Sequence, residues 1–222
     1  MRPVALYFIP SCFSCGDGYF DAAKEEDHAR RIARRVLERR EPVRRPGRPL
    51  ILVGNHWPSR SAGQYESEPF RIMAAETLAY WVERIHELHG DDVALVVLGD
   101  FNDEPFSRAL TDYARSTASR DQVLRSRSHH LLNLMAPLAG AGLGSHHFDG
   151  RPCMLDQILI SRGIVTGASG WKLAGDAVLE ARELMARPNS GAPRRFGLGH
   201  GKNVDLKGYS DHFPVGVRLT GV

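Results

Sequence analysis

The chain has 222 residues, of which 42% are hydrophobic and 25% are charged, and its formal net charge is +3 at pH 7. This composition is ordinary for a soluble globular protein, and the length suffices for one substantial domain. No apolar run approaches the roughly 18 residues that a membrane-spanning helix needs, which excludes a transmembrane segment. The mild excess of positive charge tolerates a phosphate-bearing partner without establishing one.

The first 48 residues differ in composition from the rest of the chain. Nine arginines lie between Arg30 and Arg48, and a solvated helix or hairpin edge explains them better than an arm that binds nucleic acid. We therefore interpret residues 1–48 as an atypical charged N-terminal segment and residues 49–222 as the main domain.

The three cysteines cannot form a closed set of disulfides. Cys12 and Cys15 make a C-x-x-C pair, but there is no second pair for a zinc ribbon and no βαβ context for a thioredoxin-like site. The apolar start of the chain is broken too early, at Pro10, to predict a signal peptide. The compartment stays open: cytoplasmic if Met1 is the true start, and secreted if an upstream segment is missing.

From residue 49 onward the sequence predicts strands and a helix in alternation. Residues 50–53 are a short apolar run typical of a buried strand. Ser67 and Pro69 mark a helix start, and apolar residues then recur at three- and four-residue spacing until Gly90. Residues 93–98 predict a second buried strand. Strand, helix and strand form a βαβ unit, so the two strands are expected to be parallel neighbours whose C-terminal ends share one sheet edge.

The later part of the chain is less regular. We expect a helix, a short apolar segment and a strand with a carboxylate near its start, at residues 105–113, 131–138 and 155–160. Residues 186–208 are rich in glycine, proline and arginine and indicate a long surface loop. An alternating strand is predicted at residues 215–219.

Polar side chains cluster at the ends of these predicted strands, in four islands: NHWPSR (55–60), GDFNDEP (99–105), LDQILIS (155–161) and SDHFPV (210–215). Each island is weak evidence alone, because an aspartate at a strand end is more often a cap or turn residue. Asp100 and Asn102 are two residues apart, which in an extended chain directs both side chains to one side. The histidine pairs at 129–130 and 146–147 lack a carboxylate motif and are interpreted as loop residues.

Taken together, the islands supply the groups that phosphodiester cleavage requires. The reaction needs an activated water and neutralisation of the charge that builds on the phosphoryl oxygens. Carboxylate and amide oxygens suit Mg²⁺, Mn²⁺ or Ca²⁺. A histidine held by a carboxylate can act as a base or as a cation against phosphate. No serine or cysteine has the setting of a nucleophile, which favours direct attack by water.

In this order and combination, the islands resemble the endonuclease/exonuclease/phosphatase superfamily, with its DNase I-like fold, over about residues 49–219. The resemblance implies an α/β fold, a four-layer sandwich of two mixed sheets flanked by helices. It also implies a divalent-metal-dependent phosphoesterase, with nuclease-like activity favoured. The expected cofactor is Mg²⁺, with Mn²⁺ or Ca²⁺ as alternatives. The expected substrate is a phosphate ester, with nucleic acid as one candidate, and we expect a monomer.

The resemblance assigns the acid–base roles to three residues. His212, paired with Asp156, would be the base or proton carrier that works with the attacking water. Asp100 would orient or deprotonate this water, or protonate the leaving oxygen, since family members are argued both ways.

The remaining roles implied by the resemblance concern the phosphate and the metal. Asn102 would bind a phosphoryl oxygen, His56 would bind the phosphate, and Asp211 would be a metal ligand. Asn55 and Ser59 would assist around the phosphate.

One feature of the family is missing from the sequence. Members begin with strands that carry an asparagine and then a glutamate in a Q-E-like motif, and this glutamate is a principal metal ligand. No such motif precedes residue 49, and we assign the ligand to none of the glutamates there: Glu25, Glu26, Glu38 and Glu41. We therefore expect a fold that is incomplete at its N-terminus, with weakened metal binding. The alternative is a catalytically impaired or silent remnant that acts at most as a phosphate-binding module.

Overall fold

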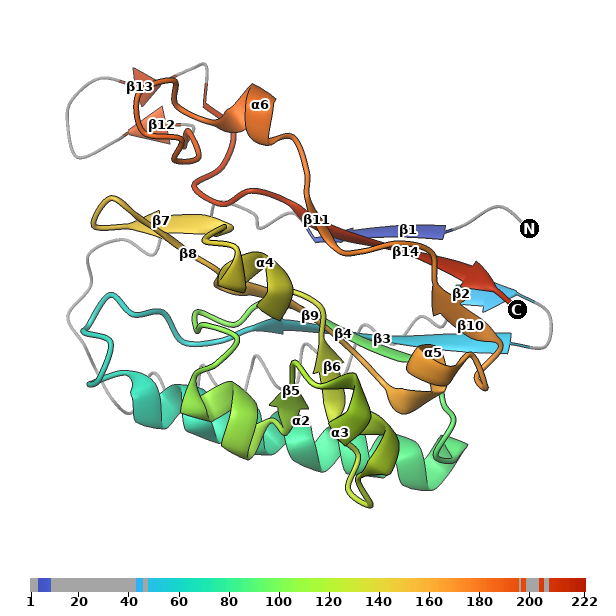
Figure 1. Cartoon of the computed structure of the whole chain (residues 1–222). Coiled ribbons are helices and arrows are strands. Elements are labelled where there is room, and N and C mark those ends of the chain that lie inside the picture. Colours follow the sequence, from blue (N-terminus) through green and yellow to red (C-terminus); the bar gives the residue numbers. More distant parts are fainter. Residues whose placement is uncertain (1–3, 9–42, 46–47, 196, 199–203, 206–207) are drawn as a thin grey trace.

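Three layers lie one above another in the computed structural model (Figure 1): helix α2 (Glu68–His89), a six-stranded sheet and a four-stranded sheet. The structure describes residues 4–8, 43–45, 48–195, 197–198, 204–205 and 208–222. Cys12, Cys15 and the four N-terminal glutamates considered above lie outside these ranges. The outer helical layer expected beyond the smaller sheet is not among the elements described.

The larger sheet contains the predicted βαβ unit. Its strands, in order across the sheet, are β2 (Val43–Arg45), β3 (Arg48–His56), β4 (Leu95–Asp100), β9 (Asp156–Ile160), β6 (Leu131–Asn133) and β5 (Ser116–Thr117). Strands β3 and β4 are parallel and joined through α2, which confirms the unit. The β5–β6 pair is also parallel, and the other pairs are antiparallel, so this sheet is mixed.

The smaller sheet is organised around the last strand. It consists of β1 (Val4–Phe8), β14 (Val215–Gly221), β10 (Trp171–Leu173) and β11 (Val178–Leu179). All three partners run antiparallel to β14. Strand β1 comes from residues 1–48, which we interpreted as an atypical charged N-terminal segment, and it pairs with β14 from Val4 to Phe8. The domain boundary after residue 48 stays a prediction.

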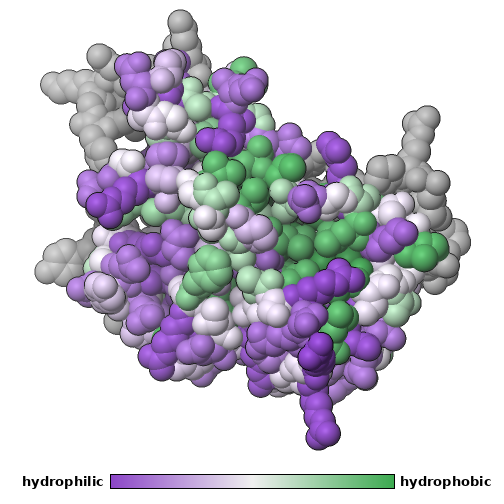
Figure 2. All heavy atoms as spheres, in the orientation of Figure 1, coloured by the Kyte–Doolittle hydropathy of each residue, from purple (hydrophilic) through white to green (hydrophobic). Residues whose placement is uncertain are grey.

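Two hydrophobic clusters lie on opposite faces of the larger sheet. Alternate residues of its central strands, such as Val96 and Ile158, pack against Val215 and Val217 of β14. The intervening residues, such as Val97, pack against the apolar stripe of α2. This two-residue period decides which side chains at the strand ends face the smaller sheet. In the view of Figure 2, apolar side chains gather in the middle of the face, around α4 and α5.

The other elements are short. They are η1 (Ala109–Tyr113, a single π-helical turn), α3 (Arg120–Arg125), α4 (Ala136–Gly140), β7 (His146–Phe148), β8 (Arg151–Cys153), α5 (Arg162–Thr166), α6 (Arg182–Met185), β12 (Gly197–Leu198) and β13 (Val204–Asp205). The helix predicted for residues 105–113 is therefore wrong except for its last turn. None of the described helices is both long and apolar enough to cross a membrane.

The start of α2 differs in one detail from the prediction. Ser67 occupies the N-cap position, but its side chain does not cap the helix. Its hydroxyl instead donates to the carbonyl of Gly63, at 2.6 Å, and accepts a hydrogen bond from Arg71. The serine thus ties the preceding loop to the first turn of α2.

Candidate active site

Strand register brings three polar residues into a row at one end of the larger sheet. His56 is paired with Asp100 across β3 and β4, and Asp100 is paired with Asp156 across β4 and β9. Each lies at two-residue spacing from residues of its own strand that pack between the two sheets, so all three side chains lie on the face toward β14. His212 lies just before β14. The predicted convergence of strand ends therefore occurs where β4 ends, on the face of the larger sheet that packs against the smaller one.

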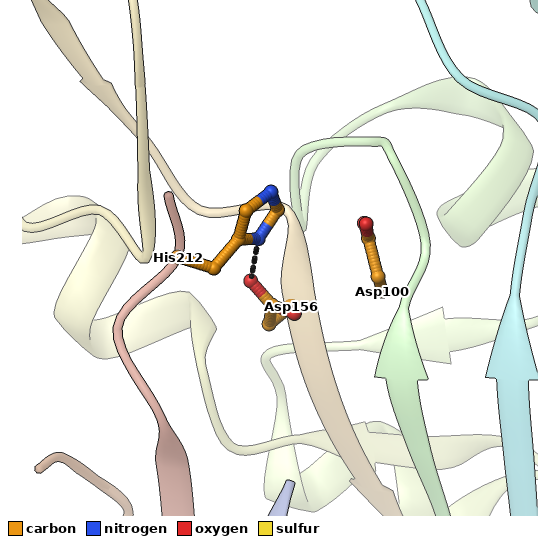
Figure 3. A group of neighbouring side chains, drawn as sticks. All are labelled: Asp100, Asp156 and His212. Carbon is orange, nitrogen blue, oxygen red and sulfur yellow. Dashed lines mark hydrogen bonds and ion pairs between the residues drawn. The ribbon is translucent and has the colours of Figure 1, made fainter. Parts of the chain in front are cut away.

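The closest contact in this group joins His212 to Asp156 (Figure 3). Nδ1 of His212 donates to Oδ2 of Asp156 at 2.6 Å, and both side chains are buried. Burial alone would lower the pKa of His212, but the hydrogen bond and charge of Asp156, with the charges of Asp100 and Asp211, raise it to about 9. The carboxylate fixes the tautomer and leaves Nε2 for chemistry.

Asp100 is a buried carboxyl group beside a like charge. Burial and the charge of Asp156 raise the pKa of Asp100 to about 7, against the opposing effects of His212 and of the Asn102 N–H, which donates to Oδ1 at 2.8 Å. Oδ2 lies 3.7 Å from Nε2 of His56, whose side chain is 61% exposed. Asp100 is therefore able to hold a proton near neutral pH.

The residues of this cluster fit a divalent cation. Asp100, Asp156 and His212 each offer one ligand atom, and these atoms all lie within 4.8 Å of one another. Oδ1 of Asp156 is buried and has no hydrogen-bond partner among the described residues. An unpartnered carboxylate oxygen and a carboxyl group that resists ionisation indicate a local excess of negative charge, which a cation would neutralise.

Asp211, the expected metal ligand, lies next to His212 at the rim of the cluster. Its side chain is 39% exposed, and Oδ2 lies 3.8 Å from Nη1 of Arg195. Its charge acts on both Asp100 and His212. The assignment of Asp211 as a metal ligand stays a prediction.

Asn102 reaches the site by a turn and not by strand alternation. The strand ends at Asp100, and Asn102 has a positive φ of 49°, so the argument from an extended chain is wrong here. Its side-chain nitrogen donates to the carbonyl of Trp57 at 3.0 Å. The tight geometry begins at Gly99, with a φ of 145°, where a Cβ atom would lie 2.0 Å from the carbonyl oxygen of Asn55.

The sequence comparison decides the family. A model described as the Endonuclease/Exonuclease/phosphatase family matches residues 4–220. The chain belongs to this family. A comparison with curated proteins finds no match. The match begins in β1, so it includes the first strand of the smaller sheet as well as the four polar islands.

Several solved structures are similar to this member of the Endonuclease/Exonuclease/phosphatase family. The human Nocturnin catalytic domain with bound sulfate is 17% identical and aligns over 81% of this chain and 50% of its own, with a TM-score of 0.45. A mannosyl-6-phosphatase of Bacteroides thetaiotaomicron is 16% identical over 79% and 52%, with a TM-score of 0.41. Staphylococcus aureus beta toxin with bound magnesium ions is 15% identical over 79% and 55%, with a TM-score of 0.41. The chain spans about half the length of these structures.

Two expected phosphate-binding residues of this family member are not brought to the cluster. Asn55 lies on the face of β3 opposite to His56, and its Oδ1 accepts a hydrogen bond from the indole N–H of Trp57 at 3.2 Å. Ser59 is exposed in the following loop, with its hydroxyl 2.8 Å from that of Ser61. Their roles at the phosphate stay predictions and have no contact in support.

His146 is the neighbour of His212 that sequence reasoning missed. The two rings lie 4.5 Å apart, and Nδ1 of His146 donates to the carbonyl of Asp211 at 2.9 Å. Burial, and then the charge of His212, lower the pKa of His146.

The segment around His146 and His147 is strand β7, so the loop interpretation is wrong for this pair. Strand β7 is joined to β8 by Asp149 and Gly150, which have positive φ values of 48° and 72°. An Asp-Gly turn between two short runs is a strong hairpin signal, and it was the available indication that the segment forms ordered structure.

Proposed function

We propose that this chain is a divalent-metal-dependent phosphoesterase that hydrolyses phosphodiester or phosphomonoester bonds by direct attack of water. The observation that carries the proposal is the buried His212–Asp156 hydrogen bond beside Asp100, which joins the two sheets where β4 ends. Family membership supports hydrolysis of an ester bond. We take a nuclease-like activity, performed by a monomer, as the first form to test, in keeping with the mildly basic sequence pI of about 8.9.

Mg²⁺ is the proposed ion, with Mn²⁺ or Ca²⁺ as alternatives, and Asp211 with Oδ1 of Asp156 would hold it. When bound, such an ion would offset the charge on the phosphoryl oxygens and would favour the neutral form of the His212 imidazole. The unpartnered Oδ1 of Asp156 supports this placement.

The protein's own groups divide the proton transfers between them. Asp156 keeps a proton on Nδ1 of His212, so Nε2 is the atom that accepts the proton of the attacking water. Asp100, whose pKa is raised to about 7, holds a proton that it can give to the leaving oxygen. His56 and Asn102 are proposed to contact the phosphoryl oxygens, because both border Asp100.

The test is one panel of substrates. Duplex DNA, DNA with an abasic site, RNA, sphingomyelin and inositol phosphates are incubated with Mg²⁺, with Mn²⁺ or with EDTA, beside the His212→Asn variant as a control. We expect hydrolysis of at least one substrate that EDTA and the variant both abolish. Hydrolysis that persists in EDTA would contradict the proposal. Retention of phosphate binding without any hydrolysis would favour the silent remnant.

A further inference from the structure

Arg60 joins the two loops that border the site. Its Nε donates to the backbone carbonyl of Asn102 at 2.7 Å, and its Nη2 donates to Oδ1 of Asp103 at 2.7 Å. In return, the Asn102 side chain donates to the carbonyl of Trp57, in the loop that carries Arg60. Each of the loops after β3 and β4 thus donates a hydrogen bond to the other, and Asn102 takes part in both directions.

A second arginine, on helix α2, donates to the other oxygen of the Asp103 carboxylate. Arg71, in the first turn of α2, donates from Nε to Oδ2 of Asp103 at 3.0 Å and is 1% exposed. Its other nitrogens donate to the Ser67 hydroxyl, at 2.6 Å, and to the carbonyl of Gln64, at 2.8 Å. Arg71 therefore anchors Asp103 to the helix, and none of these bonds of Arg71 reaches Asn102. Arg60 alone of the two arginines holds Asn102 itself.

The geometry of Asn102 explains why it needs to be held. A positive φ is uncommon for a residue with a side chain, although asparagine tolerates it better than most. The amide has two N–H groups, and the bond to Trp57 is its one side-chain donation to a described residue, which leaves the second N–H for a substrate oxygen. A planar guanidinium can grip a carbonyl and a carboxylate together, which a lysine ammonium does less well.

We propose that Arg60 is a positioning residue that acts through Asn102: by fixing the carbonyl of Asn102 and the carboxylate of Asp103, it aims the free amide hydrogen at a phosphoryl oxygen. This inference rests on the proposed function for the role of Asn102.

The experiment compares kcat and KM for hydrolysis of bis(4-nitrophenyl) phosphate with Mg²⁺. We expect Arg60→Met to lower kcat by about 10- to 100-fold, the scale of losses from misplaced groups, with little change in KM. Arg60→Lys keeps the charge and is expected to behave more like Arg60→Met than like wild type. Arg162→Met is the matched control, because it removes an arginine bonded to Asp92 at 2.9 Å, and we expect kcat to stay at the wild-type value.

A double-mutant cycle separates positioning from direct contact. If Arg60 acts through Asn102, then Arg60→Met added to Asn102→Ala causes no further loss of kcat. The inference would be overturned if the fold-losses of kcat in the two single variants multiply in the double variant. It would also be overturned if Arg60→Met changes only KM. Recovery of wild-type kcat in Arg60→Lys would also overturn it, because charge alone would then be sufficient.

A second measurement does not depend on activity. It still tests the role of Arg60 if the wild-type protein hydrolyses none of the substrates, a result that would contradict the proposed function alone. Hydrogen exchange is then measured for the peptide that contains residues 100–105, where the N–H of Glu104 donates to Asp103. Faster exchange in Arg60→Met than in Arg162→Met, at equal melting temperatures, supports the positioning role. Equal exchange in the two variants overturns it.

Discussion

The larger sheet carries a histidine paired with carboxylates at each of its two ends. At the end where β4 finishes, His212 donates to Asp156 at 2.6 Å. At the opposite end, where α2 finishes, the ring nitrogens of His129 lie 2.6 Å from Glu83 and 3.2 Å from Asp91. The two groups use the same residue types at similar distances, so residue types and distances alone do not tell a site from a structural contact.

The difference lies in what is left unpaired. At the α2 end, Glu83 bonds to both His129 and Arg115, and the ring of His129 stacks on that of His86 at 3.8 Å. At the β4 end, Oδ1 of Asp156 is buried without a partner among the described residues, and Asp100 resists ionisation. Complete pairing stabilises the fold, whereas buried charge without a partner is found more often at functional sites than in structural contacts.

The largest effect expected from this comparison is on catalysis. His212→Asn should lower kcat by about 10²- to 10⁴-fold, the usual contribution of a positioned acid or base. The matched change at the other end, His129→Asn, should leave kcat unchanged because His129 belongs to the fully paired cluster. Steady-state kinetics on the best substrate of the panel make the test. Equal losses in the two variants would remove the distinction between the two ends.

The next effect concerns stability at the β4 end. The pKa of Asp100 is raised by burial and by Asp156, so the folded state binds its proton more tightly than the unfolded chain does, and stability is lost as pH rises from about 4 to about 7. Asp100→Asn removes a carboxylate that the fold disfavours. We expect its melting temperature to exceed that of wild type by several degrees at pH 8 and by much less at pH 4. A melting temperature below that of wild type at pH 8 would contradict this.

At the α2 end, the dependence of stability on pH has the opposite sign. Burial disfavours the charge of Glu83, but the hydrogen bond and charge of His129 and the charge of Arg115 overcome it and lower the pKa of Glu83. Its stabilising contribution is present above pH 4.5 and is lost as pH falls through the lowered pKa. Glu83→Gln should therefore melt a few degrees below wild type at pH 7, and the gap should narrow on acidification. Thermal unfolding of both proteins across pH 3 to 7 measures this difference in melting temperature. A difference that widens in acid would contradict the prediction.

The smallest effect involves His86. Burial is the main cause that lowers its pKa, so the unfolded chain binds this proton more tightly, and stability falls as pH drops below about 6.5. His86→Phe keeps a ring to stack on His129 but cannot take up a proton. We expect the variant to lose less stability than wild type between pH 7 and pH 5, as measured by urea unfolding. Parallel losses in the two proteins would show that His86 does not carry the dependence.

Local patterns in the sequence were sufficient for the frame of the site. The apolar runs before His56 and Asp100, with an amphipathic helix between them, predict two parallel strands whose ends meet, and register places these two residues side by side. The embedded Asp156 was also found from its strand. Each of these inferences needs only neighbours in the chain and the period of a strand or helix.

What sequence reasoning missed depends on contacts between distant segments. Asn55 and His56 are consecutive, and only the face of β3 that meets the smaller sheet shows that one enters the cluster and the other does not. The bond between Arg60 and Asp103 spans 43 positions, and that between His146 and Asp211 spans 65. No periodicity encodes such pairs, because they are set by how the sheets and loops pack.

The His212–Asp156 bond also has a mechanical meaning. Asp156 is the first residue of a strand of the larger sheet, whereas His212 leads into the central strand of the smaller one, so the proposed catalytic pair joins the two halves of the sandwich. If the halves slide by even an ångström, the two groups separate while every strand stays intact. Under the proposed function, the rate of hydrolysis would therefore report how firmly the two halves are docked, which secondary structure alone does not.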